Sequence, residues 1–127
     1  MSAAGLYCSL VADASLRRKD PATLVGSPSL KKAFDKMRRD YPVPSPGRER
    51  GDGHVHSVYY DLYSLERAMM ISKTDRLGDR DWYHDGALYI LMNQGLGGEW
   101  IDTTDTCFAL LFLKKAYIAV ATGDPNR

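Results

Sequence analysis

The sequence predicts an all-α fold built from helical hairpins. Apolar residues recur at intervals of three and four in five segments of the chain, which is the period of an amphipathic helix. Glycine and proline clusters separate these segments, and no run alternates apolar and polar residues in the way a strand does. At 127 residues the chain can bury one ordinary core. We therefore expect one domain over 1–127.

Two helices are predicted before residue 42. Residues 4–17 place Leu6 and Leu10 among small residues, a pattern typical of a helix packed closely against its neighbours. Ser27 then precedes Pro28, the usual order of an N-cap and a first helical residue. The apolar face of this second helix carries Leu30, Ala33, Phe34 and Met37. Its opposite face, expected to be solvated rather than anion-binding, carries Lys31, Lys32, Lys36, Arg38 and Arg39.

A loop and a third helix follow. The run PVPSPGRERGDG contains too many prolines and glycines for a helix, so an exposed loop is expected at about 42–54. The third helix is expected at about 56–72, where one stripe holds Val58, Leu62, Leu65 and Met69. An aromatic flank beside that stripe holds Tyr59, Tyr60 and Tyr63. So wide an apolar surface predicts an inner helix buried on several sides.

The fourth and fifth helices are predicted from their caps. Asp79 or Asp81 is expected to cap a helix that ends near Gln94. Asp102 is expected to cap a last helix, whose apolar spacing continues to Ala119.

Composition limits the classes of partner and of compartment. Seventeen basic against sixteen acidic residues give a net charge of +1, which does not favour nucleic acid or an anionic membrane as the main partner. The longest apolar run, residues 107–113, is far shorter than a membrane span. No cleavage site follows residues 1–16, so no signal peptide is predicted. Cys8 and Cys107 alone make no disulfide framework, and a reduced compartment is the default. A cytoplasmic location is thus expected, or a secreted or periplasmic one if a leader precedes this chain.

A recurrent pattern joins the last two helices. Gly86, Tyr89, Gln94, Gly98 and Trp100 stand as G-x2-Y-x4-Q-x3-G-x-W. This resembles the QW repeat of the terpenoid cyclase and protein prenyltransferase superfamily, a toroid of paired α-helices. The segments HVHSVYYDLYSLERAMMIS, DWYHDGALYIL and DTCFALLFLKKA extend the resemblance to bacterial prenyltransferase and squalene oxidase repeat proteins.

The resemblance carries structural expectations over most of the chain. The Gln94 side chain is expected to bond backbone groups at the start of the following helix, and Trp100 to stack on Gln94. A complete toroid needs more helices than this sequence supplies, so the resemblance implies the C-terminal portion of a longer ring.

One candidate catalytic motif begins the fifth helix. Squalene-type cyclases carry D-x-D-D-T there, and the middle Asp protonates the substrate alkene. The matching stretch here is 102–106, DTTDT, with Thr104 at the protonating position. A hydroxyl cannot protonate an alkene, so cyclisation should not start here. Asp102 and Asp105 remain the candidate carboxylates, although helix capping explains both.

A second comparison concerns zinc. Prenyltransferase β-subunits bind catalytic zinc through a D-x-C pair and a distant His, and Asp105 and Cys107 stand here as D-T-C. No His follows Cys107, so only His54 or His56 could complete the site through folding. A buried apolar role for Cys107 is the favoured alternative, and no cofactor is expected.

The leading functional interpretation is a non-catalytic piece of such a ring. Its concave face would lie between 59–69 and 105–113 and bind an apolar, isoprenoid-like small molecule or a peptide. The candidate ligand-binding residues are Tyr59, Tyr63, His56 and Trp82. One alternative is a fragment of a terpenoid cyclase-like or zinc prenyltransferase-like enzyme whose catalytic residues lie elsewhere. Another is a protein-interaction scaffold that binds the missing repeats, or another chain, at an open edge.

Overall fold

The computed structural model describes residues 3–41, 43 and 58–114, and within them the chain is helical. Its elements in chain order are α1 (Ala3–Arg17), the 3-10 helix η1 (Pro21–Leu24), α2 (Pro28–Arg39), α3 (Val58–Ile71), α4 (Trp82–Met92) and α5 (Thr103–Leu113). In this part of the chain β pairing is limited to an isolated bridge between Leu77 and Arg80. The predicted all-α class is therefore confirmed, whereas the toroid stays a prediction.

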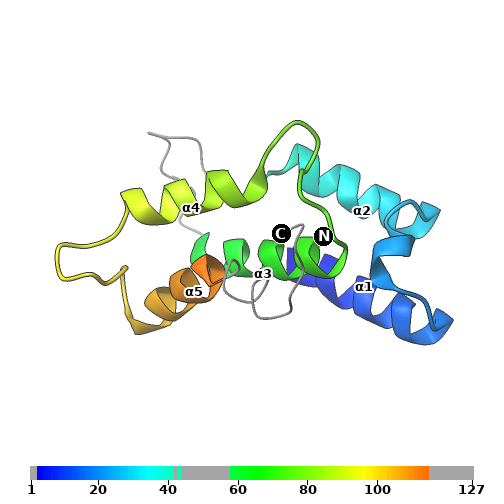
Figure 1. Cartoon of the computed structure of the whole chain (residues 1–127), viewed down its shortest axis with the longest axis horizontal. Coiled ribbons are helices and arrows are strands. Elements are labelled where there is room, and N and C mark those ends of the chain that lie inside the picture. The colour runs from blue at the N-terminus through cyan, green and yellow to red at the C-terminus, as the bar shows by residue number, and fades with distance from the viewer. Residues whose placement is uncertain (1–2, 42, 44–57, 115–127) are drawn as a thin grey trace.

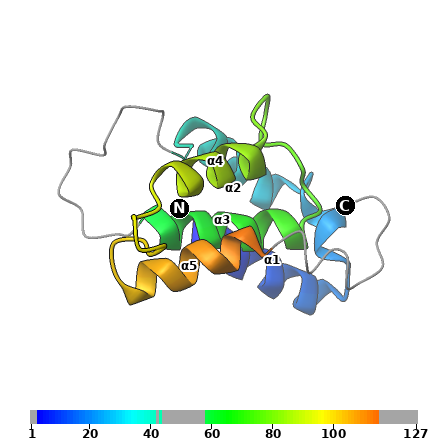
Figure 2. The ribbon, with the colours of Figure 1, turned by 60° about the vertical axis from the view of Figure 1, so that its left-hand side comes forward.

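Helix α3 is the central element of the fold. It packs most extensively on α1 and on α5, and it also touches α4. In both ribbon views α2 and α4 lie above α3, and α1 and α5 lie below it (Figures 1 and 2). Its fully buried side chains are Leu62, Leu65, Ala68 and Met69. The prediction that this helix is buried on several sides is thus correct.

The two ends of the molecule along its long axis come from different parts of the chain. The hairpin of α1 and α2 occupies one end, and the turn between α4 and α5 occupies the other (Figure 1). The end of α1 and the α4–α5 turn therefore point in opposite directions.

The starts of the helices follow their capping residues. Asp81, rather than Asp79, caps α4, because its carboxylate accepts a hydrogen bond from the backbone N–H of His84 at 3.0 Å. Asp102 caps α5 by accepting from Asp105 N–H at 2.7 Å. Ser27 is the N-cap residue of α2, although its side chain makes no capping bond.

The turns that end α1 and α3 share a backbone geometry that no glycine in the sequence signals. Arg18 and Lys73 have φ angles of 50° and 52°, in the left-handed region where glycine usually ends a helix. The next residue in each case bonds back across the last turn, with Lys19 N–H to Ala14 O at 3.1 Å and Thr74 N–H to Met69 O at 2.9 Å. Both ends are therefore closed turns that carry a cationic side chain.

Some boundaries of helices and loops differ from the predicted ones or lie outside the described residues. Helix α4 ends at Met92, two residues before the expected Gln94. The expected continuation of the last helix to Ala119 lies outside the described residues, as does nearly all of the expected loop at 42–54. The exception in that loop is Val43, whose side chain is buried. Within the described residues, no helix has both the length and the apolarity to cross a membrane.

Candidate functional site

The turn between α4 and α5 is held by Trp100. Its indole N–H donates to the carbonyl of Ile90 in the last turn of α4 at 2.8 Å, and its side chain is 3 % exposed. Its backbone N–H donates to Oγ1 of Thr106 in α5 at 3.0 Å. Trp100 therefore ties the two helices together. Thr106 was missed by sequence reasoning, because only the folded turn brings its hydroxyl to Trp100.

Gln94 has a different role from the one expected. Its Nε2 donates to the carbonyl of Gly98 at 2.9 Å, so it closes the turn on itself. Gly98 has a φ of 89°, a conformation that favours glycine. The expected bond from Gln94 to the start of the next helix is replaced by this bond, since Gly98 precedes α5.

Gly86 and Tyr89 serve the packing of α4. A Cβ atom at Gly86 would lie 2.5 Å from Cζ of Phe112, so glycine permits α4 and α5 to approach closely. The ring of Tyr89 lies 6.1 Å from that of Tyr59 on α3, centroid to centroid. The five residues of the pattern thus shape one helical hairpin.

The candidate ligand-binding residues pack against protein. Tyr59 is buried, and burial, with smaller effects from Tyr89 and Asp105, raises its pKa to about 12. Tyr63 is half-buried, and its ring centroid lies 5.5 Å from that of Phe108. Trp82 is 1 % exposed, and its indole N–H donates to Thr74 O at 2.7 Å, which gives this side chain a core role. His56 lies outside the described residues.

The candidate catalytic and metal residues separate on α5. Asp102 caps the helix, Asp105 is buried, and Thr104 is exposed. Cys107 is exposed, so the expectation that it is buried is wrong. Within the described ranges no three His, Cys, Asp or Glu side chains gather as a metal site. His54 lies outside those ranges, so zinc stays a prediction.

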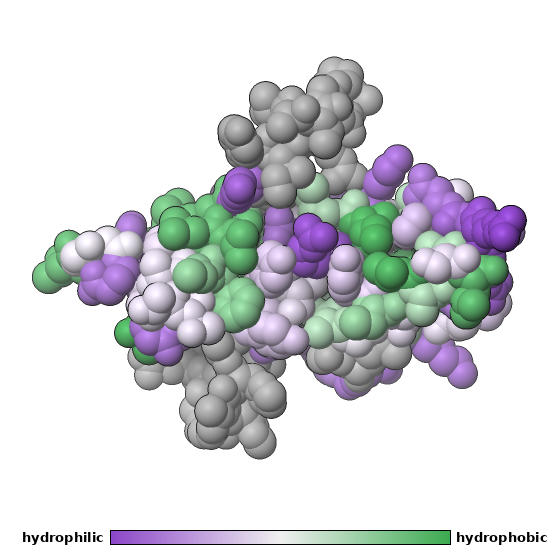
Figure 3. Space-filling view, turned by 90° about the horizontal axis from the view of Figure 1, so that it is seen from below, coloured by the Kyte–Doolittle hydropathy of each residue, from purple (hydrophilic) through white to green (hydrophobic). Residues whose placement is uncertain are grey.

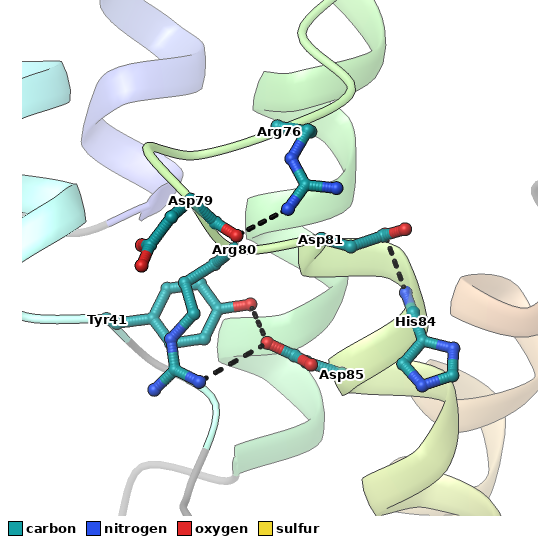
Figure 4. Close-up of polar contacts among 7 residues, drawn as sticks. All are labelled: Tyr41, Arg76, Asp79, Arg80, Asp81, His84 and Asp85. Carbon is teal, nitrogen blue, oxygen red and sulfur yellow. Dashed lines mark hydrogen bonds and ion pairs between the residues drawn. The ribbon is translucent and has the colours of Figure 1, made fainter.

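A polar cluster joins the end of α2 to the start of α4 (Figure 4). The hydroxyl of Tyr41 donates to Asp85 Oδ2 at 2.9 Å, and Arg80 Nη1 lies 4.0 Å from the same oxygen. The Arg80 guanidinium also lies 5.1 Å from the centroid of the Tyr41 ring. Burial and the bond to Asp85 raise the pKa of Tyr41 well above its ordinary value. The contacts of Tyr41 and Arg80 with Asp85 thus join the segment after α2 to the first turn of α4.

Exposed apolar side chains gather on α4 and its following turn. Five of these exposed residues together are called the α4–α5 surface: Leu88, Leu91, Met92, Leu96 and Ile101. Leu88, Leu91 and Met92 stand at i, i+3 and i+4, and therefore share one face of α4. Leu91 is 59 % exposed and Met92 67 %. Ile101, 85 % exposed, directly follows Trp100, whose bond to Ile90 holds it near the end of α4.

The charge of this hairpin is one-sided. Residues 81–113 contain no Lys or Arg. Their acids are Asp81, Asp85, Glu99, Asp102 and Asp105. Residues 3–41, by contrast, carry eight Lys and Arg against four Asp and Glu. In the view from below, hydrophobic residues lie at the outermost point of the α4–α5 end with hydrophilic residues beside them, and the opposite end shows hydrophilic residues together with hydrophobic ones (Figure 3).

Comparisons with known proteins return no relative. No family model, no curated protein and no solved structure matches the chain. The resemblance to the terpenoid cyclase and prenyltransferase superfamily gains no support from them, and the function must be argued from the geometry.

Proposed function

We propose that this chain is a non-catalytic, helical protein-binding domain, and that the α4–α5 surface docks a basic amphipathic helix of its partner. The observation that carries the proposal is the exposure of Leu91, Met92 and Ile101 together on a hairpin without Lys or Arg. Exposed apolar groups that gather in one place mark interaction sites, whereas single ones are ordinary.

The apolar stripe suits a helix as its occupant. Leu88, Leu91 and Met92 make a ridge along α4, and ridges of this spacing pack into the grooves of a facing helix. Complete burial of a Leu or Met side chain contributes about 1.5 to 3 kcal/mol, so several together can offset part of the entropy lost on association.

The acids beside the stripe select a basic partner. Glu99 and Asp102 are exposed in the turn, next to Leu96 and Ile101. Carboxylates in these positions steer a cationic partner and disfavour an acidic one, and salt weakens this effect. The capping role of Asp102 does not remove its negative charge.

Other features favour binding over chemistry. Asp102 is engaged in its cap, and Asp105 is buried. The aromatic rings expected to bind an apolar ligand pack on other rings of the protein, with the centroid of Tyr63 lying 5.5 Å from that of Phe108 and the centroid of Tyr59 6.1 Å from that of Tyr89. An isoprenoid-like ligand and an enzyme fragment stay alternatives that rest on the resemblance alone.

The test is the affinity of the chain for a synthetic amphipathic peptide of Leu and Lys, measured by fluorescence anisotropy. A Leu and Glu peptide of the same pattern, and a scrambled Leu and Lys peptide, serve as controls. We expect the patterned basic peptide to bind more tightly than both. The variant Leu91→Gln/Met92→Gln should bind it at least about tenfold more weakly, a change of about 1.4 kcal/mol.

A matched variant tests whether the peptide binds at the α4–α5 surface. Leu16 is also exposed, but it lies at the end of α1, on the far side of the molecule. Leu16→Gln should not weaken the binding of the peptide. Equal loss in Leu16→Gln and Leu91→Gln/Met92→Gln, or equal binding of patterned and scrambled peptides, would refute docking at the α4–α5 surface.

A charge variant tests the polar part of the proposal. Asn caps a helix about as well as Asp, so Asp102→Asn removes a charge and keeps the cap. The variant Glu99→Gln/Asp102→Asn should show a smaller decrease of affinity with added salt than the unaltered chain. An unchanged salt dependence would refute the part assigned to these acids.

A further inference from the structure

The end of α1 offers the chemical complement of the α4–α5 surface. We call residues 16–19, Leu-Arg-Arg-Lys, the α1 tip. Leu16 is 83 % exposed and is the only large apolar side chain that stands exposed among the described residues before α3. Arg17, Arg18 and Lys19 are exposed beside it. An exposed leucine next to three cations matches what the acidic, apolar surface would bind.

The α1 tip has a defined shape. Arg18 adopts the left-handed conformation, and Lys19 N–H bonds to Ala14 O, so the backbone is closed rather than frayed. A preformed turn loses less conformational entropy on docking than a flexible one.

Nearby acids have other partners. Asp20 accepts a hydrogen bond from Ala22 N–H at 2.9 Å and lies 3.8 Å from Lys73 Nζ. Asp13 accepts from Ser29 Oγ at 3.5 Å. Asp20 keeps its negative charge beside the α1 tip, so three cations, Arg17, Arg18 and Lys19, stand against one adjacent acid.

The two surfaces lie at opposite ends of the long axis (Figure 1). The α1 tip of a molecule thus points away from its own α4–α5 surface, and each molecule presents one of each. Complementary surfaces that differ from one another produce a heterologous contact, which extends into a chain or closes into a ring.

We propose that copies of this chain associate head to tail, with the α1 tip of one copy docked on the α4–α5 surface of the next. The inference rests on the proposed function and narrows it, because the occupant of the same surface is then the basic end of a helix, residues 16–19 of a second copy, in place of the face of a longer helix. Leu16 packs on the stripe of Leu91 and Met92, and the cations of the α1 tip face Glu99 and Asp102.

The first experiment is sedimentation velocity of the unaltered chain over a series of concentrations. The weight-average mass should rise with concentration, and it should rise less at about 500 mM than at about 50 mM salt, where the Debye length is longer. A monomer at every concentration would overturn the proposal.

The second experiment uses two variants with one altered surface each. Leu16→Gln/Arg17→Gln alters the α1 tip, and Leu91→Gln/Met92→Gln alters the α4–α5 surface. Each alone should be monomeric, and their mixture should form a one-to-one dimer, because each supplies the surface the other lacks. Neutral replacements are used so that the two altered surfaces do not attract one another.

Other results of that experiment exclude the head-to-tail arrangement. If the α1 tip variant still associates while the surface variant does not, two α4–α5 surfaces pair with each other and the proposal is wrong. If the mixture stays monomeric, it is also wrong. Should Arg17→Gln unfold the end of α1, as a changed melting profile would show, Leu16→Gln/Lys19→Gln replaces that variant.

The peptide titration separates the two proposals. A chain that binds the basic peptide but stays monomeric keeps the proposed function and loses the head-to-tail partner. A chain that does neither loses both. Where both hold, the peptide should also dissociate the assembly, because it competes for the same surface.

Discussion

At the scale of single residues, Trp100 is the side chain on which the α4–α5 hairpin depends most. Its indole is buried and bonded to Ile90 O, and its backbone is bonded to Thr106. We predict that Trp100→Ala lowers the free energy of unfolding by about 3 to 5 kcal/mol, the range for emptying a large aromatic site. Urea denaturation measures it. The matched variant is Ile101→Ala, which removes an exposed side chain and should change stability by less than about 0.5 kcal/mol. A loss below about 1 kcal/mol in Trp100→Ala would contradict this role.

The absence of a side chain at Gly86 lets α4 and α5 approach closely. Because a Cβ there would meet the buried ring of Phe112, Gly86→Ala should destabilise the fold by about 1 to 3 kcal/mol despite the higher helix propensity of alanine. Phe112 is stacked on Tyr83 and has little room to move. Thermal melts of the variant measure the effect.

Two controls accompany that variant. Gly26 has nothing near its would-be Cβ, so Gly26→Ala should be neutral or slightly stabilising. Gly86→Ala combined with Phe112→Leu should cost less than the sum of the two single changes. A neutral Gly86→Ala would show that the two helices can separate without loss.

Tyr59 gives the stability a dependence on alkaline pH. Its folded pKa of about 12 lies above the ordinary value near 10, so the folded state holds its proton more tightly than the unfolded state does. This contribution is complete below about pH 10 and is lost as the pH rises through about 12. Urea midpoints at about pH 9 and pH 11 should therefore differ, and less so in Tyr59→Phe. Part of the difference should persist, since burial also raises the pKa values of Tyr41 and Tyr83. An identical decrease in the variant would refute the assignment.

At the scale of elements, the helix starts could be predicted from their capping residues, and the ends of α1 and α3 were predicted to within one residue, at 17 and 72 against Arg17 and Ile71. Asp102 and Ser27 precede their helices as capping residues do, and Asp81 was one of the two candidates for α4. The left-handed turn after α3 could not be predicted, because Lys73 occupies the position where glycine is the usual signal. A Lys there carries a steric cost that only the folded backbone reveals.

The end of α3 yields a stability prediction. Lys73→Gly should be more stable than Lys73→Ala by about 1 kcal/mol, because glycine adopts a φ of 52° without the Cβ penalty. The alanine variant is the matched control, since both changes remove the contact of Lys73 with Asp20. Denaturant midpoints compare them. An alanine variant as stable as the glycine variant would show that this turn is not strained.

At the scale of the whole molecule, the all-α architecture follows from periodicity but the exposed surface does not. Leu88 and Leu91 belong to an apolar run that reads like core in the sequence. Which of these side chains is buried depends on how α4 packs on its neighbours, and in the structure Ile90 is buried whereas Leu91 is exposed. The net charge of +1 likewise conceals a basic end and an acidic end. Predictions from composition alone therefore missed the exposed apolar side chains of the α4–α5 surface.

The central claim is that the α4–α5 surface is where this chain meets its partner. Methyl NMR during titration with the patterned Leu and Lys peptide tests it most directly. We expect the methyl signals of Leu88, Leu91, Met92 and Ile101 to shift together and to saturate at one peptide per chain, while that of Leu65 in the core stays in place. Shifts confined to methyl groups remote from α4 and its turn, with these four unmoved, would contradict it.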